Sequence, residues 1–360
     1  MRYSISRTNR VSSDEPLSLA PLRHMTRRHF FQTSGLGLGA AALHSLLAND
    51  SRAAAPGDAN PLAAKPPMIP ARAKHVIYLH MAGSPSQLEL FDHKPELEKL
   101  HMQDAPASFL EGKRFAFIRG VPKVLAGQFK FARHGESGQV ISELLPNLAR
   151  VADKLSVIRT VHTDQFNHAP AQLFVHTGSQ RLGNPSLGAW TTYGLGSENA
   201  DLPGFVVLLS GGKTPDAGKS LWGSGFLPSV YQGVKFRSGG DPVMWLNDPE
   251  GFEREQRRDW LDTLNTLNRR KLDEFGDPEI ATRIAQYEMA YKMQTSVPEL
   301  TDLSGEPESI RAMYGPEVEK PGSFARNCLL ARRMVERDVR FIQLFHRGWD
   351  HHSILPQDRK

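Results

Sequence analysis

HVIYLHMAGSP, at residues 75–85, is the stretch of sequence that decides the fold. Residues 75–81 form a continuous, mostly apolar run, and the turn residues Gly83, Ser84 and Pro85 end it. An apolar run of this length between turn residues is typical of a strand that is buried on both faces of a parallel sheet. We therefore predict a buried strand at 75–81.

Three more segments have the same character, and helical patterns separate them. The predicted strands are residues 155–161, 204–209 and 339–345. The predicted helices are residues 139–154, 169–176 and 323–337, with two further helices in the charged stretch 253–295 that are broken near Gly276. Apolar strands that alternate with helices indicate an α/β fold, with a mainly parallel sheet sandwiched by helices.

The composition is typical of a soluble globular protein. Of the 360 residues, 39% are hydrophobic and 23% are charged, and the net charge is +5. Many of the arginines lie near the start of the chain, so the remainder is closer to neutral and no nucleic-acid partner is implied. The single cysteine, Cys328, excludes an intramolecular disulfide, and we interpret it as a structural thiol rather than a nucleophile.

Residues 1–55 have the features of a twin-arginine signal peptide. The hexapeptide TRRHFF at 26–31 carries the paired arginines, a Gly/Ala-rich apolar run follows at 35–48, and AAA at 53–55 offers a cleavage site. The alternative is an amphipathic or core helix that happens to follow two arginines. The run is too short and too polar for a permanent membrane anchor. We expect the twin-arginine export machinery as a partner, a periplasmic or extracellular protein, and a flexible Pro/Ala-rich linker at 56–72.

Two acids follow the first predicted strand at the point where it ends. Glu89 and Asp92 lie in the segment GSPSQLELFD at 83–92. Ligands for hard divalent metals are often placed beyond the carboxyl end of a buried strand, and carboxylate oxygens suit such ions. The alternative is an ordinary loop with solvated acids. Taken alone, these two residues favour that alternative.

The second polar cluster lies where a predicted strand gives way to a predicted helix. The segment HTDQFNHAPAQLFVHTG at 162–178 contains three histidines, which are good ligands for zinc-like metals when neutral. A helix that begins near Ala169 would present free backbone N–H groups to an anion, so Asn167 and Ala169 are candidate anion-binding residues. The alternative is a capped helix start, with Asn167 as the N-cap and Pro170 in the first turn. Both interpretations can hold together.

The third polar cluster, HRGWDHH at 346–352, follows the last predicted strand. Asp350 and His352 are two residues apart on a loop, so both can reach one metal ion from the same side. Three histidines within seven residues favour a metal site over the alternative of a structural turn.

These segments resemble the family catalogued as domain of unknown function 1501. The resemblance rests on MAGSPSQLELFDHKP at 81–95, NHAP at 167–170, TGSQ at 177–180, PSLGAW at 185–190, YGLG at 193–196 and GWDHH at 348–352. The family is grouped with the alkaline phosphatase and sulfatase superfamily. The resemblance therefore implies an alkaline phosphatase/sulfatase-like domain over 73–360 and a divalent metal, which would be Zn, Ca, Mg or Mn.

The resemblance also implies roles for single residues. Aligning the sulfatase pattern Cys/Ser-x-Pro-Ser-Arg places His168 at the nucleophile position, so the standard sulfatase mechanism is not expected. The candidate catalytic groups are His168, nearby Thr163 or a metal-bound water. Asp350 and His352 would be metal ligands, and Glu89 stands where family members often have Asp. The expected metal ligands are Glu89, Asp92, Asp350 and His352.

Family members continue beyond the matched motifs with a Gly-Glu-Phe-Gly-Arg-Thr-like block and an Asp-His pair. We therefore expect the domain at 73–360 to be incomplete at its C-terminus. The expected function is that of an exported, metal-dependent hydrolase-like protein that acts on phosphate or sulfate esters of a small molecule or polymer, with turnover lost if the missing block is essential. The alternatives are a non-enzymatic exported binding or assembly protein on the same scaffold, and a truncated product without function.

Overall fold

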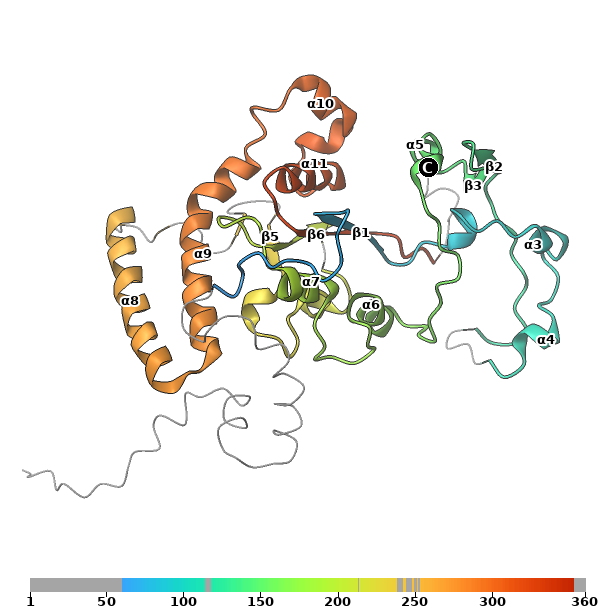
Figure 1. Ribbon diagram of the computed structural model, residues 1–360. Helices are drawn as coiled ribbons and strands as arrows, with labels where there is room; N and C mark the ends of the chain where they lie inside the picture. Colours follow the sequence, from blue (N-terminus) through green and yellow to red (C-terminus); the bar gives the residue numbers. More distant parts are fainter. Residues whose placement is uncertain are drawn as a thin grey trace, which may run out of the picture. The chain divides into compact units, whose positions relative to one another are not determined.

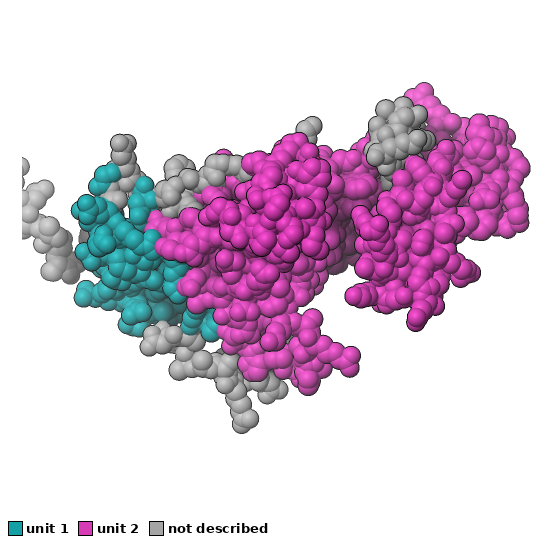
Figure 2. All heavy atoms as spheres, turned by 90° about the horizontal axis from the view of Figure 1, so that it is seen from above, with its two compact units in different colours: residues 1–63, 248–292 teal, residues 64–247, 293–360 magenta. Residues whose placement is uncertain are grey.

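The structure is a computed structural model that describes residues 60–113, 118–212, 214–237, 242–243, 248, 251 and 253–352. The predicted signal peptide at 1–55 lies outside the described residues. The chain divides into two compact units, which Figure 2 colours separately. Unit 1 comprises residues 1–63 and 248–292, and unit 2 comprises residues 64–247 and 293–360.

Unit 2 contains the parallel sheet that the apolar segments predict. Its strand order is β1-β6-β4-β5, and every neighbouring pair is parallel. The strands are β1 (Val76–Ala82), β4 (Phe205–Ser210), β5 (Val234–Phe236) and β6 (Phe341–Arg347). The predictions of strands at 75–81, 204–209 and 339–345 are confirmed to within two residues. The three-residue strand β5 was not predicted.

Helices cover both faces of this sheet (Figure 1). Helices α6 (His168–Thr177) and α7 (Leu187–Leu195) lie on one face, and α11 (Phe324–Val335) lies on the other. Apolar side chains from α6, β4, β6 and the segment after β4 form the core on the first face: Leu173, Phe205, Val207, Leu221, Trp222, Phe341 and Phe345. The chain therefore has an α/β fold with a mainly parallel sheet flanked by helices, as the sequence predicts.

One face of the edge strand β1 is exposed. Helix α11 packs on β4 and β6, whereas Ile77, Leu79 and Met81 of β1 are 44%, 56% and 38% exposed. Neighbouring large apolar side chains on a sheet face mark a surface that commonly binds another element or molecule.

The segment between β1 and α6 differs most from the prediction. The single helix predicted at 139–154 is wrong, because β3 (Gln139–Ser142) pairs antiparallel with β2 (Phe131–His134). Glycines at positive φ, Gly135 and Gly138, let the chain reverse between them, and this local pairing overrides the helical periodicity. The α-helices of this segment are short: α3 (Pro95–Lys99), α4 (Ala107–Leu110) and α5 (Pro146–Ala149).

The strand predicted at 155–161 is also wrong. These residues form no strand, and Ile158 and Val161 are 73% and 75% exposed. Their β-branched side chains favour an extended chain, but a strand also needs a neighbour to pair with.

Unit 1 contains α8 (Arg254–Phe275) and the first part of α9 (Pro278–Thr301). Gly276, at φ 62°, ends α8 where the sequence predicts the break. Arg258 of α8 joins the two helices, because it pairs with Glu288 of α9 at 2.7 Å. It also pairs with Asp262 of its own helix at 2.6 Å. Helix α10 (Glu308–Met313) follows in unit 2. No helix in the described ranges is long and apolar enough to cross a membrane.

Candidate functional site

Three loops meet beyond the carboxyl ends of β1, β4 and β6. The backbone N–H of Trp349, after β6, donates to the carbonyl of Ala82 in β1 at 3.3 Å. A Cβ built on Gly83, whose φ is 115°, would lie 2.3 Å from the backbone nitrogen of Asp350. Glycine is required by both that dihedral and that approach. Gly211, after β4, also lies close to the chain that leaves β6. Ligands of parallel α/β sheets bind at this edge.

The carboxylate of Asp350 lies between two imidazole rings at this edge. His168 Nε2 is 3.3 Å from one carboxylate oxygen, and His352 Nε2 is 3.0 Å from the other. His168 is the first residue of α6, so the helix brings its ring to the loop that follows β6. The side chains of His168 and Asp350 are 35% and 48% exposed, so solvent reaches the cluster. The structure thus brings together one predicted catalytic residue and two predicted metal ligands.

A second acid, Asp216, belongs to the same site and was not predicted from the sequence. Asp216 accepts a hydrogen bond from Gln172 Nε2 at 3.1 Å and pairs with Arg347 Nη2 at 3.1 Å. Burial raises the pKa of the Asp216 carboxyl, but the Gln172 hydrogen bond and the charges of Arg347 and His168 together outweigh it and lower the pKa. Arg347 also donates to the carbonyl of Thr214. Asp216 and Arg347 were recognisable only by their positions just after β4 and at the end of β6.

The other residues of the second polar cluster have separate positions. Asn167 occupies the N-cap position of α6 in an extended conformation, and its side chain makes no capping hydrogen bond. Ala169 lies in the first turn of that helix, next to His168. Thr163 is exposed, and its hydroxyl accepts from the backbone N–H of Gln165 at 3.1 Å.

The acids after β1 have local partners of their own. Glu89 is buried, and its carboxylate oxygens lie 3.0 and 3.3 Å from the backbone nitrogen of Gln128, which donates to them. Asp92 pairs with Lys94 at 2.9 Å. Both contacts stabilise the segment that contains α3, β2 and β3. The structure does not bring these two acids to His168 and Asp350.

The donor atoms of the cluster are of the types that bind metal ions, but they are not already arranged around a common point. Two imidazole nitrogens and a carboxylate are the donor types that zinc and manganese take in proteins. In the structure they contact one another, and no three His, Cys, Asp or Glu side chains within the described ranges already converge to hold a metal ion.

A buried pair of histidines packs α6 against β1. The rings of His176 in α6 and His80 in β1 lie 4.7 Å apart, with Tyr78 and Phe345 against His176. Burial lowers the pKa of both histidines to about 4, and the charge of His80 lowers that of His176 further. Nε2 of His176 is buried without a hydrogen-bond partner among the described residues, while Nδ1 lies 2.8 Å from the Gln172 carbonyl. Both rings are therefore neutral and part of the core.

Acid should destabilise the protein through this pair. The folded-state pKa of His176, about 4, lies below its ordinary value of 6.5, so its contribution is complete above pH 6.5 and is lost as the pH falls towards 4. The loss corresponds to about 3 kcal/mol for this ring. Urea unfolding at several pH values gives the free energy of unfolding, which should depend less on pH in His176→Phe than in the native chain. An unchanged dependence would show that His176 is not held neutral.

The surroundings of Cys328 agree with its interpretation as a structural thiol. Cys328 lies in α11 and is partly buried, and burial raises the pKa of its thiol to about 11. A thiol with a raised pKa is a poor nucleophile at neutral pH.

A protein family matches most of the chain. The match covers residues 73–360 and so includes the whole sheet, α6 and every residue of the His168–Asp350 cluster. No curated protein and no solved structure matches the chain. On this match, the chain belongs to the family described as Protein of unknown function (DUF1501).

Proposed function

We propose that this chain is an exported hydrolase of phosphate or sulfate esters that uses a divalent metal. The observation that supports the proposal most directly is the position of Asp350, whose two carboxylate oxygens lie 3.3 and 3.0 Å from Nε2 of His168 and of His352. This cluster lies beyond the carboxyl ends of parallel strands, where α/β enzymes place their sites. The twin-arginine motif at 26–31 supports export.

Each residue of the cluster has a role in this proposal. Asp350 and His352 would hold the metal, which when bound polarises the ester and lowers the pKa of a water molecule. His168 would move a proton at Nε2, with Asp350 fixing the orientation of its ring. At the position of the sulfatase nucleophile this chain has His168 instead of serine or cysteine, which favours attack by water.

The neighbouring cation and helix start would bind the ester group. Asp216 and the carbonyl of Thr214 hold the guanidinium of Arg347, whose side chain is 30% exposed. A guanidinium fixed in this way suits the planar edge of a phosphate or sulfate group. The start of α6 at Asn167 and Ala169 adds backbone N–H groups, which favour negative charge.

The experiment is an ester-hydrolysis assay on the exported protein, purified without chelator. We expect turnover of p-nitrophenyl phosphate or p-nitrophenyl sulfate, its loss on treatment with a chelator, and its recovery when zinc or manganese is returned. Absence of turnover of both esters with every divalent ion tested would contradict the hydrolase proposal.

A non-enzymatic binding or assembly protein is the second candidate. The exposed Ile77, Leu79 and Met81 on β1 favour it, because a chain that presents such a surface commonly binds a partner there. This candidate predicts a stable complex after export and no ester turnover, so the same assay separates the two.

A further inference from the structure

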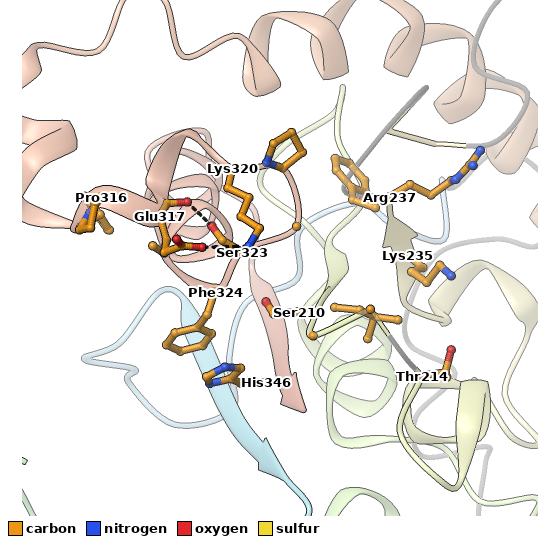
Figure 3. A pocket seen from close by; sticks show the side chains of 18 residues that line it. Ser210, Thr214, Lys235, Arg237, Pro316, Glu317, Lys320, Ser323, Phe324 and His346 are labelled. Atoms are coloured by element: carbon orange, nitrogen blue, oxygen red, sulfur yellow. Dashed lines mark hydrogen bonds and ion pairs between the residues drawn. The ribbon is translucent and has the colours of Figure 1, made fainter. Parts of the chain in front are cut away.

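Two cavities flank β5, at the edge of the sheet opposite β1. The first, of about 940 Å³, lies between the ends of β4, β5 and β6 and the segment that leads into α11 (Figure 3). The second, of about 810 Å³, lies between β5 and the segments around 183–184 and 219–225. Lys235 and Arg237 line both cavities. The two cavities therefore adjoin along one strand.

Most of the charged side chains that line the two cavities are basic. Lys320 lines the first and Lys219 the second, in addition to the shared Lys235 and Arg237. Glu317 is the one acid among the described lining residues, and it lies 3.3 Å from Lys320. Neither Lys235 nor Arg237 has an acidic partner in the described part of the chain. Because the whole sequence has 44 basic and 39 acidic residues, four cations with one acid is a local concentration of positive charge.

Figure 3 shows how the cations surround the first cavity. Lys320 lies on the α11 side, Lys235 and Arg237 lie on the β5 side, and Ser210 and His346 lie between them. Ser210 is 1% exposed, and its hydroxyl oxygen accepts from Asn327 Nδ2 at 2.7 Å, which leaves its proton for another acceptor. Oxygens of a sulfate or phosphate group accept from such donors.

The second cavity presents backbone and small hydroxyl side chains. Its lining includes the serines and glycines Gly183, Ser220, Gly223, Ser224, Gly225 and Gly233. Such a lining offers hydrogen-bonding groups close to the surface, as the hydroxyls of a sugar require.

The aromatic rings disfavour a nucleic-acid ligand. Single-stranded nucleic acids are held by bases that stack on exposed rings. Here Trp222 and Phe236 are 7% and 2% exposed, and Phe324 already stacks on His346 with ring centroids 4.4 Å apart. Tyr314, which lines the first cavity and is half-buried, is the one other ring of the described lining. The lining thus offers mainly charge and hydrogen bonds rather than a row of exposed rings.

We propose that the two cavities along β5 bind an extended polysaccharide that carries sulfate or phosphate ester groups. Thr214 links this surface to the candidate site, because it lines the first cavity and its carbonyl accepts from Arg347, which pairs with Asp216. The inference deepens the proposed function by naming the class of substrate. Its test measures binding alone, so its outcome does not depend on turnover.

The test compares two double variants of the full chain. Lys235→Gln/Arg237→Gln removes the two shared cations. Arg269→Gln/Lys271→Gln on α8 is the matched control, because it removes one lysine and one arginine at the same spacing from exposed positions. Fluorescence anisotropy of labelled dextran sulfate, with unmodified dextran as the uncharged competitor, measures binding at several salt concentrations.

We expect dextran sulfate to bind saturably and dextran not to compete. The variant at 235 and 237 should lose about tenfold in affinity, and the control should bind as the native chain does. The slope of log affinity against log salt should fall by about two in the first variant only. Equal losses in both variants, absence of saturable binding, or tighter binding of a single-stranded oligonucleotide than of dextran sulfate would each overturn the proposal.

Discussion

Asp350→Asn is expected to lower ester turnover by about three orders of magnitude, within the range that acid–base groups contribute. The amide keeps the size of the side chain but removes the negative charge between His168 and His352, which lie 3.3 and 3.0 Å away. Both rings would lose the group that orients them, and a metal would lose its one anionic ligand in the cluster. The measurement is kcat/KM for the better of the two p-nitrophenyl esters at saturating metal.

A second histidine–aspartate pair in the same sheet provides the control. His75 Nε2 lies 3.5 Å from Asp338 Oδ1 at the amino ends of β1 and β6, opposite to the candidate site. Asp338 has φ 59°, which asparagine tolerates well, so Asp338→Asn should fold normally. Turnover should be unchanged in Asp338→Asn. Equal activity of the two variants would remove Asp350 from the site.

Gly83→Ala is expected to destabilise the protein by about 3 kcal/mol, since it combines an unfavourable φ with a steric clash. At φ 115°, the new Cβ would lie 2.3 Å from the backbone nitrogen of Asp350 and 2.7 Å from the carbonyl carbon of Trp349. Backbone atoms cannot move aside as the end of a flexible side chain can, so the loop after β6 would shift. Urea unfolding gives the free energy of unfolding.

Gly212→Ala separates the two contributions. Gly212 has φ 73°, and a Cβ there would meet nothing within 4 Å. This variant should therefore lose only the conformational contribution, about 1 kcal/mol. If both variants lost the same free energy, the close approach of the loops after β1 and β6 would be refuted.

Three strands of the parallel sheet were predictable because they are continuous apolar runs, whereas β5 has only three residues, one of them a lysine. Segments 75–81, 204–209 and 339–345 correspond to β1, β4 and β6, which are neighbours in the sheet. Residues 155–161 have the same local character but form no strand. Local propensity indicates which segments can be strands, whereas pairing depends on contacts between segments distant in the chain. The hairpin of β2 and β3 shows the same limit at 139–142.

The candidate site was predictable where polar residues follow strands or begin helices. His168, Asp350 and His352 were found in this way, and the structure places them in contact. Asp216 was missed because it is a single acid without a motif. Arg347 lies in the third polar cluster but was given no role, because it meets Asp216 only when the loop after β4 folds back to the end of β6.

Glu89 shows that position after a strand does not determine what a carboxylate binds. It follows β1 as a metal ligand would, yet its oxygens accept from the backbone N–H of Gln128, which lies 39 positions further along the chain. The sequence around Glu89 contains no sign of this partner. Glu89 is therefore not part of the proposed metal site.

The most direct test of the site is an anomalous-difference map from crystals of the protein grown with manganese or zinc. The proposal predicts a metal peak within bonding distance of an Asp350 oxygen and His352 Nε2, with His168 left free to move a proton. A map without a peak at Asp350 and His352, or with its peak at Glu89 and Asp92 alone, would contradict the proposal that Asp350 and His352 hold the catalytic metal.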